Sequence, residues 1–256
     1  MLPPPDMPPP VFADWLAALE ARHLSDLRVA EVTRALRALS SAYVERRGEA
    51  GVRALDSAGK RAAFALFYAP LHFLVTHFIV RALGADRPPP RAILDIGCGT
   101  GATGAAWALA AGGTSSVTGL DRHPWAVAEA RWTYRQLGLR GQARQADIGR
   151  LPPVGPGTAA VAGYVLNELP GAVRERVERR LVEAAARGAR VLVIEPIARR
   201  TTPWWGEAAS RIEAAGGRAD EWRFAVDLPP LLRLLDKAAG LDHRELTARS
   251  LYCSGS

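Results

Sequence analysis

Three glycines alternate with small residues in the segment Ile93-Leu-Asp-Ile-Gly-Cys-Gly-Thr-Gly101. The apolar residues before these glycines predict a buried strand, and the alanine-rich residues after them predict a helix. Glycine at positions 97, 99 and 101 allows a tight turn and a close approach of the backbone to a ligand. Asp95 precedes the first glycine by two residues, and its carboxylate favours a cationic ligand over a phosphate. The segment therefore predicts a ligand site at the end of a strand.

The same region also satisfies a second pattern. Gly99-Thr-Gly101-Ala-Thr-Gly104 fits G-x-G-x-x-G, the dinucleotide fingerprint, and Asp121 follows Gly99 by 22 residues, where a ribose-binding acid is expected. A nicotinamide-dependent reductase is therefore an alternative, against which Asp95 and Asp147 both argue, because carboxylates repel a pyrophosphate.

An alternation of strands and helices must position these residues. Helices are expected at 102–111, 124–137 and 173–187, between strands at 92–96, 117–120, 143–146, 158–166 and 190–195. This order predicts a doubly wound α/β fold with a parallel sheet. After it, the pattern predicts helices at 203–215 and 229–239, and strands near 242–247 and 249–253.

The chain before this alternation reads as helical. Residues 1–10 contain six prolines and predict a disordered leader. Residues 11–86 predict a helical N-terminal cap, with a break near 48–51 and a long apolar helix over 60–83 that is kinked at Pro70. Prolines at 88–90 separate this cap from the main domain, expected over 91–256. The longest apolar stretch, 64–80, is interrupted by His72, Thr76 and His77, so no membrane span is expected.

Composition restricts the classes of function. The 256 residues carry a net charge of +7, and 48% hydrophobic with 23% charged residues excludes a wholly disordered chain. Only Lys60 and Lys237 are lysine among 33 cationic side chains, so the arginine excess is attributed to a GC-rich genome as readily as to a nucleic-acid partner. Two cysteines exclude a disulfide framework and favour the cytoplasm.

The motif LDIGCGTG resembles the first motif of the class I methyltransferases that use S-adenosylmethionine (SAM). The resemblance implies a Rossmann-like sheet of seven strands whose last strand is antiparallel, and it implies SAM as the cofactor. It assigns Asp121 to the ribose hydroxyls, Asp147 to the adenine amino group and Ile148 to the adenine ring. The cofactor-binding residues implied in this way are Asp95, Gly97, Cys98, Gly99, Gly101, Asp121, Arg122, Asp147, Ile148 and Asn167.

A narrower resemblance involves the segments VLNELP at 165–170 and VLVIEP at 191–196. Together with a helical N-terminal region, they are similar to the methyltransferase-like family of the mitochondrial and bacterial small ribosomal subunit. That likeness implies ribosomal RNA or the small subunit as a partner. Two departures stand against it: two cysteines cannot hold the iron–sulfur cluster of some members, and Ile197-Ala-Arg replaces the usual Gly-Thr-Pro.

Methyl transfer from a sulfonium needs positioning and a deprotonated nucleophile. The candidate catalytic residues are Glu168 and Glu195, with Asn167 expected to face the methyl group. His123, His72 and His77 are further candidates for a base, although the spacing of the last two favours packing near the domain seam. No Cys/His spacing fits zinc, so no metal is expected.

Substrate contacts are expected after the fifth strand. There Arg199, Arg200, Trp204 and Trp205 could hold phosphates and stack bases, or the tryptophans could begin a packed helix. The leading prediction is a SAM-dependent methyltransferase acting on ribosomal RNA or on a small molecule enclosed under the cap. The alternative is a SAM-binding assembly factor of the small ribosomal subunit that needs no turnover.

Overall fold

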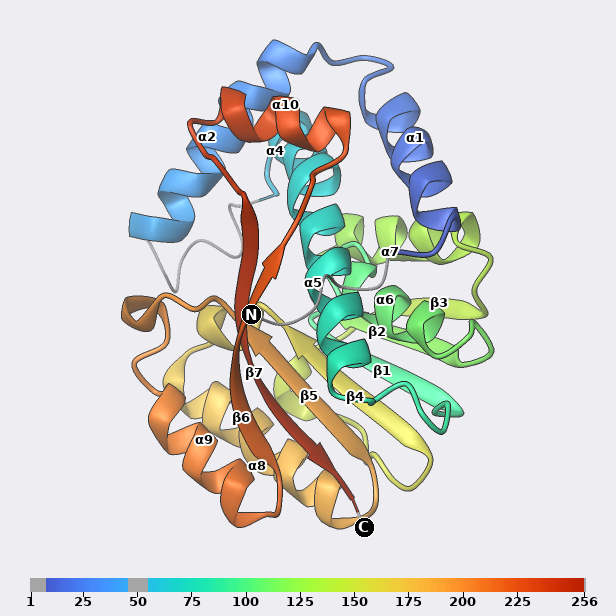
Figure 1. Cartoon of the computed structure of the whole chain (residues 1–256), viewed down its shortest axis with the longest axis vertical. Helices are drawn as coiled ribbons and strands as arrows, with labels where there is room; N and C mark the ends of the chain where they lie inside the picture. Colours follow the sequence, from blue (N-terminus) through green and yellow to red (C-terminus); the bar gives the residue numbers. More distant parts are fainter. Residues whose placement is uncertain (1–7, 46–54, 256) are drawn as a thin grey trace.

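A seven-stranded sheet forms the centre of the protein (Figure 1). The computed structural model describes residues 8–45 and 55–255, with the side chains of 41–45 left aside. The strands follow the order β3-β2-β1-β4-β5-β7-β6. Their bounds are β1 Ala92–Ile96, β2 Ser116–Asp121, β3 Gly141–Gln145, β4 Thr158–Gly163, β5 Arg190–Glu195, β6 Arg218–Ala225 and β7 Glu245–Ser254.

The first five strands are mutually parallel, and only β7 runs against its neighbours β5 and β6. This confirms the predicted seven-stranded Rossmann-like sheet with an antiparallel last strand. The strand order reverses between β1 and β4, and in such sheets ligands bind beyond the carboxyl ends of the strands at that point.

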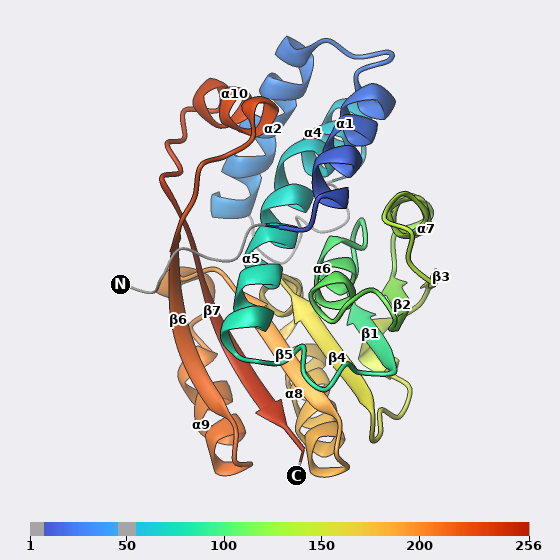
Figure 2. The same cartoon turned by 45° about the vertical axis from the view of Figure 1, so that its right-hand side comes forward.

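Helices cover both faces of the sheet. On one face lie α8 (Gly171–Ala186) and α9 (Trp205–Ala214), and on the other α6 (Ala102–Ala110) and α7 (Pro124–Gln136) (Figure 2). The strand residues alternate accordingly: Ile93 and Ile194 belong to the core on the α6 side, while Leu94 and Val193 belong to the core on the α8 side. Both faces of the parallel strands are therefore shielded from water. This burial accounts for the nearly continuous apolar sequence of these strands.

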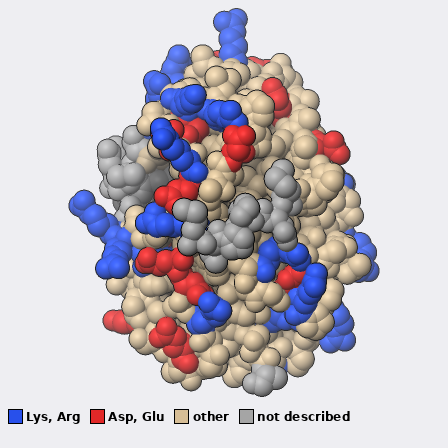
Figure 3. All heavy atoms as spheres, viewed as in Figure 1, with Lys and Arg blue, Asp and Glu red and all other residues tan. Residues whose placement is uncertain are grey.

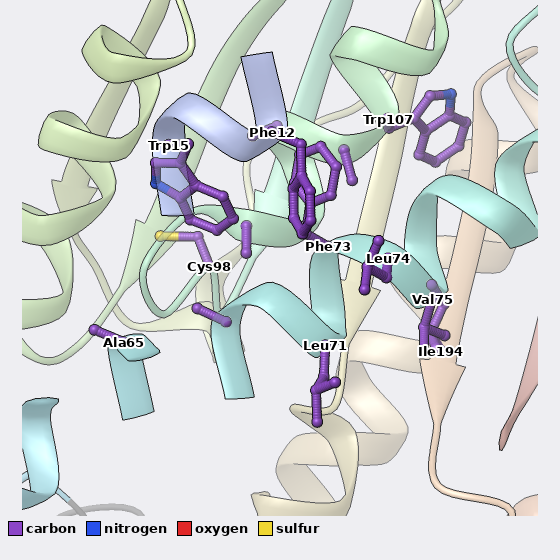
Figure 4. Close-up of a cluster of buried hydrophobic side chains, with 14 of the residues drawn as sticks. Phe12, Trp15, Ala65, Leu71, Phe73, Leu74, Val75, Cys98, Trp107 and Ile194 are labelled. Carbon is purple, nitrogen blue, oxygen red and sulfur yellow. The ribbon is translucent and has the colours of Figure 1, made fainter. Parts of the chain in front are cut away.

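The N-terminal helices lie above the carboxyl ends of the strands, and the last of them continues down beside α6 over one face of the sheet (Figure 2). They are α1 (Val11–His23), α2 (Val29–Glu45), α4 (Ala58–Ala63) and α5 (Ala69–Ala82), joined at the top by α10 (Pro230–Ala238). Phe12 stacks on Phe73 with ring centroids 4.9 Å apart, and Trp15 packs beside them (Figure 4). These rings belong to the same buried cluster as Ile93 and Ile194, so the helical region shares one core with the sheet.

A polar contact also fastens α1 to the main domain. The carboxylate of Glu129 in α7, 1% exposed, accepts hydrogen bonds from the guanidinium of Arg22 and is 2.8 Å from Nε2 of His23. The Arg22 guanidinium also lies over the ring of Trp132, 4.9 Å from its centroid. A buried carboxylate with two hydrogen-bonding partners on α1 resists separation of the two elements, because separation would leave its charge buried and unpaired.

The long apolar helix is continuous from Ala58 to Ala82 but changes its winding in the middle. Phe64–Tyr68 forms a π-turn, in which the N–H of Ala69 donates to the carbonyl of Phe64. Pro70 follows directly; it has no N–H for the carbonyl of Leu66, and its ring crowds that carbonyl in a regular helix. The predicted interruption at Pro70 is thus a π-turn just before it, and this turn carries aromatic side chains.

The same helix is long and apolar enough to cross a membrane, with a mean hydropathy of 1.7 over its most apolar window. That window is 83% buried inside the protein, as is usual for a core helix. Two further expectations concern other segments. The leader at 1–10 falls mostly, and the break at 48–51 entirely, outside the described residues.

The C-terminal strands differ from the sequence prediction. The two short strands expected near 242–247 and 249–253 are one strand, β7, and the pairing partner β6 was not predicted at all. Its sequence, RADEWRFA, is half charged, and only Trp222 and Phe224 are buried. An edge strand with one wet face lacks the apolar run by which the parallel strands are found.

Candidate active site

A cavity of about 1000 Å³ lies between the carboxyl ends of the strands and the helical cap. Its lower part, here called the donor end, is formed by residues that follow β1, β2, β3 and β4. These are Gly97, Cys98, Gly99, Thr100, Asp121, Arg122, His123, Gln145, Asp147, Ile148, Asn167 and Glu168. Its upper part, the acceptor end, is formed by the cap and by the last strands. These residues are Phe64, Tyr68, Leu71, His72, Val75, Tyr164, Ile197, His243, Leu246 and Thr247.

The glycine turn at the donor end has no room for side chains. Gly97, Gly99 and Gly101 adopt φ values of +66°, +51° and +81°. A Cβ on Gly97 would stand 2.3 Å from Val165, and one on Gly101 would stand 2.7 Å from Tyr134. Glycine is therefore required both by the left-handed backbone and by the close neighbours.

Asp121 stands at the end of β2 with its carboxylate on the cavity wall. Oδ2 accepts a hydrogen bond from the N–H of Gly99 at 2.9 Å, and Oδ1 accepts one from the N–H of His123 at 2.8 Å. Each carboxylate oxygen has a second lone pair, so both can still accept from a ligand. The two backbone donors fix the carboxylate in the orientation that a paired diol needs.

Asp147 and Ile148 lie beside it, after β3, and also line the cavity. Asp147 caps the short helix Ile148–Arg150, because its Oδ1 accepts from the N–H of Gly149 at 2.9 Å. Arg122 lines the same wall. The structure thus brings together, at one end of one cavity, residues that the sequence places after three different strands.

Two residues expected to contact the cofactor lie beneath the turn instead. Asp95 is 1% exposed and does not line the cavity; its Oδ2 accepts from the N–H of Gly104 at 2.8 Å, at the start of α6. Burial raises the pKa of Asp95 to about 7, against the effect of that hydrogen bond. Gly101 likewise faces Tyr134 and not the cavity. Both support the turn from below, which corrects the expectation of direct contact.

Glu195, which the sequence suggested as a catalytic base, is instead a buried residue that holds the backbone after β4. It is 0% exposed and absent from the cavity wall. Its Oε1 accepts from the N–H groups of Leu166 and Asn167, at 2.9 and 3.2 Å, and so holds the segment that follows β4. Burial raises the pKa of Glu195 to about 8, which keeps this carboxyl group protonated at neutral pH. It cannot meet a substrate in this position.

Glu168 and Asn167, in contrast, both line the cavity where the donor and acceptor ends meet. Burial raises the pKa of Glu168 to about 7, while Arg122 lowers it and Asp121 raises it. A carboxyl group whose pKa is close to neutral can exchange a proton under ordinary conditions.

The acceptor end is an aromatic enclosure; the sequence predicted that the cap and its segment 68–77 could enclose a small molecule, but not which side chains meet there. His72 stacks on Tyr164, and Phe64 meets His72 edge-on with centroids 6.2 Å apart. The hydroxyl of Tyr68 is 3.0 Å from Oγ of Ser40. Burial lowers the pKa of His72 to about 3, so its ring is neutral. The aromatic spacing around Pro70 was the available signal, but the π-turn that rotates these rings toward the cavity has no pattern of its own.

The two other histidines considered as bases are less suited. His77 is 5% exposed within the core and is not on the cavity wall. His123 does line the cavity, but its Nδ1 accepts from the N–H of Trp125 and caps α7. Burial, followed by the charge of Arg61, lowers the pKa of His123.

The predicted arginine–tryptophan surface does not form. Trp204 and Trp205 are 8% and 9% exposed and pack into the core on the α8 side, so they cannot stack bases. Their ring faces are covered by the guanidinium groups of Arg174 and Arg249. Arg199 and Arg200 are exposed but stand outside the cavity. On the face shown in Figure 3, cations lie among carboxylates and form no continuous band.

Comparison with known proteins agrees with this geometry. Residues 93–188 match the model of a family described as a methyltransferase domain. No curated protein is similar enough in sequence to match the chain.

Solved structures share the fold at low sequence identity. Mitomycin 7-O-methyltransferase has 18% identity and a TM-score of 0.53, over 97% of this chain and 74% of that one. The SAM-dependent methyltransferase SibL has 19% identity and a TM-score of 0.52, over 96% and 74%. Magnesium protoporphyrin IX methyltransferase from Synechocystis PCC 6803, solved with bound SAM, has 17% identity and a TM-score of 0.48, over 73% and 80%.

The fold and the site define a class I methyltransferase. This chain contains a SAM-dependent methyltransferase domain, it is an enzyme, and SAM is its cofactor. The residues at the donor end fit that cofactor: Asp121 offers two anchored acceptor oxygens for a ribose diol, and Asp147 and Ile148 line the same cavity. The nicotinamide alternative is thereby set aside. None of the comparisons given above shows the family of the small ribosomal subunit.

Proposed function

We propose that the enzyme methylates a small, planar and largely apolar molecule that is enclosed under the helical cap. One observation carries this proposal: the cavity continues from the glycine turn into an acceptor end walled by Phe64, Tyr68, His72 and Tyr164. Aromatic walls favour flat aromatic ligands through stacking and burial of apolar area. A volume of about 1000 Å³ accommodates a cofactor together with a second small molecule.

A polymer substrate is less compatible with this site. A nucleotide in a chain must enter with its neighbours, yet the acceptor end is walled by the π-turn Phe64–Tyr68, by α5 and by the start of β7. The tryptophans expected to stack bases are buried. The structural neighbour at 18% identity whose name includes a substrate, mitomycin 7-O-methyltransferase, acts on a small molecule and supports the same class of acceptor.

When bound, SAM supplies a methyl group that is already activated by its sulfonium. The residues of this chain then hold the reactants and manage one proton. Asp121 and Asp147 hold the nucleoside, and the glycine turn lets the backbone approach it closely. Transfer of that methyl group to an oxygen or nitrogen of the acceptor would leave one proton to be removed, and a base of this chain would receive it. Glu168, with its pKa near 7, is the group on the wall suited to accept that proton.

The remaining residues act by position. Glu195 holds the backbone of Leu166 and Asn167 from below, so it fixes the segment that carries Glu168. His72 remains neutral and forms part of the enclosure, and the cap excludes water from the reacting atoms. In this account most of the rate enhancement comes from orientation.

Transfer of tritium from labelled SAM into an extract of the source cells tests the proposal. After incubation the extract is separated into RNA, protein and small-molecule fractions. The label is expected in the small-molecule fraction, and Asp121→Ala is expected to abolish its appearance. Incorporation into RNA or protein that depends on the intact enzyme would contradict an enclosed small acceptor.

A further inference from the structure

A buried carboxylate holds one histidine at the acceptor end of the cavity. Asp236, in α10, is 3% exposed. Its Oδ2 accepts from the backbone N–H of His243 at 2.8 Å, and its Oδ1 is 2.5 Å from Nδ1 of the same residue. The backbone carbonyl of Asp236 also accepts from the N–H of Leu241. The loop from α10 to β7 is therefore wound around this side chain, and the imidazole has one fixed orientation.

The pairing also determines which nitrogen is available to a ligand. An ionised carboxylate only accepts, so Nδ1 of His243 carries the proton and donates it to Asp236. In the neutral ring Nε2 then has a free lone pair. The side chain is 36% exposed and lines the cavity, next to the ring of Phe67 and to Leu246. His243 thereby adds a residue with an available acceptor atom to a wall that is otherwise largely apolar.

His243 is remote from the donor end. β7 pairs with β5 only from Arg249 onward, opposite Glu195. The earlier residues of β7 pair only with β6, and these two strands continue past the end of β5 toward the cap (Figure 2). His243 precedes Arg249 by six residues, a distance of up to about 20 Å along an extended chain. The donor residues follow β1, β2 and β3 near the level of the strand ends. A ligand that meets both His243 and the donor end must therefore be elongated.

We propose that His243 determines acceptor specificity: its Nε2 accepts a hydrogen bond from a hydroxyl or N–H group at the end of an elongated planar acceptor that is remote from the methylated atom. Asp236 is a positioning residue that fixes the tautomer and the orientation of the ring. This inference rests on the proposed function, because it assumes an enclosed small acceptor. It adds that the acceptor carries a polar group at each end.

A pair of matched probes tests the inference without knowledge of the natural acceptor. Flavone and 7-hydroxyflavone have the same planar skeleton and differ by one hydroxyl group at one end. Their affinities for the full chain are measured by calorimetry at a pH where the hydroxyl of the probe is protonated, with the demethylated product of SAM at saturation. The intact protein is expected to bind 7-hydroxyflavone about 5- to 10-fold more tightly than flavone, since one hydrogen bond is added.

Two variants identify the group responsible. In His243→Phe, which keeps a ring of similar size, both probes are expected to bind with equal affinity, while the affinity for the demethylated cofactor stays unchanged. Asp236→Asn is expected to reduce the preference, and Asp242→Asn, an exposed acid in the same loop, to leave it intact. If Asp236→Asn does not fold, the relative affinity of the two probes in His243→Phe decides whether His243 accepts the hydrogen bond.

The failures are distinguishable. If neither probe binds the intact protein, the enclosed planar acceptor of the proposed function is contradicted, and the inference falls with it. If both probes bind and the preference persists in His243→Phe, the role of His243 is overturned and the proposed function stands.

Discussion

The imidazole of His72 lies face to face with the phenol ring of Tyr164, with centroids 3.9 Å apart and planes inclined by 12°. His72 comes from α5 in the cap, and Tyr164 directly follows β4 in the sheet. Tyr164 has a φ of +59°, which is rare for a bulky residue, and its N–H donates to the carbonyl of Ile194 at 2.7 Å. Backbone strain of this kind is maintained where surrounding contacts impose it, commonly at functional sites. The stack thus joins the helical cap to the end of β4 within the acceptor end of the cavity.

Replacing His72 separates a packing role from a chemical one. His72→Phe preserves a neutral stacked ring, and we expect KM for the acceptor to stay within about twofold of the parent. His72→Ala removes the stack, and KM is expected to rise about tenfold, since such pairs contribute about 0.5–1.5 kcal/mol beyond buried area. Steady-state kinetics measure both, with affinity for the demethylated cofactor as the control. A loss in His72→Phe as large as in His72→Ala would show that a ring nitrogen takes part in the chemistry.

Asp121→Ala removes both acceptor oxygens offered to the ribose. The affinity for SAM is expected to fall by about 100-fold or more, because two hydrogen bonds to a charged acceptor are lost and each contributes about 1.5–3 kcal/mol. Calorimetry measures the change, and Asp242→Ala, which is 68% exposed at the side chain, is the matched control. Unchanged binding in Asp121→Ala would remove the assignment of the donor end.

The raised pKa of Glu168 predicts how kcat/KM depends on pH. A general base works when ionised, so kcat/KM is expected to rise with pH and to level off above about 7, the pKa of this group. Glu168→Gln cannot ionise, and we expect its rate to be lower by about 100-fold or more and its profile to lose that rise. Glu175→Gln, an exposed substitution on α8, serves as the control. A parent profile that is retained in Glu168→Gln argues against this base.

The stability of the protein without ligand is expected to decrease as pH rises. Burial raises the pKa of Asp95 to about 7 and that of Glu195 to about 8, so the folded state binds protons that the unfolded state releases above about pH 4. Their stabilising effect is complete below pH 4 and is lost as pH approaches 8, by at most about 1.4 kcal/mol per pH unit for each group.

Thermal unfolding between pH 5.5 and 8 measures this slope. The midpoint is expected to fall by roughly 5–10 °C in the parent and by less in Glu195→Gln, which keeps an acceptor for Leu166 and Asn167 but cannot ionise. Glu183→Gln, about half exposed, should retain the parent slope. A midpoint that rises with pH over this range would refute the argument.

The exposed arginines after β5 provide a test against RNA. The double variant Arg199→Ala/Arg200→Ala is expected to bind RNA with the same affinity and the same salt dependence as the parent, because the proposed acceptor is a small molecule and these two side chains are not on the cavity wall. Arg179→Ala/Arg180→Ala, on the exposed side of α8, is the matched control. A salt slope reduced by about one to two phosphate equivalents in the first variant alone would show that Arg199 and Arg200 contact RNA phosphates.

The donor end could be predicted from the sequence because each of its residues follows a recognisable strand. Asp121 and Asp147 lie at strand ends, and parallel strands bring their carboxyl ends to one edge. Glu195 also ends a strand, yet it points beneath the segment after β4, a difference of direction that chain order does not contain. Trp204 and Trp205 pack into the core on the α8 side, and the order of residues along the chain does not indicate this direction either.

The acceptor end could not be predicted because it depends on contacts between distant segments. The stack of His72 on Tyr164 joins residues 92 positions apart, and it requires both a π-turn and a left-handed residue. His243 stands in a loop whose function is visible only once β6 and β7 are seen to continue beyond the sheet. Because half of the residues of β6 are charged, the sequence pattern did not predict this strand or its extension.

The two ends of the cavity come from different stretches of the chain. The donor end comes from residues between 97 and 168, whereas the acceptor end is taken from Tyr164 and largely from residues 64–75 before this stretch and 196–247 after it. Evolution can therefore diversify the flanking stretches while the central one is kept. A chimaera that receives both flanks from another enzyme of this architecture should inherit the acceptor preference of that enzyme and retain its own affinity for SAM.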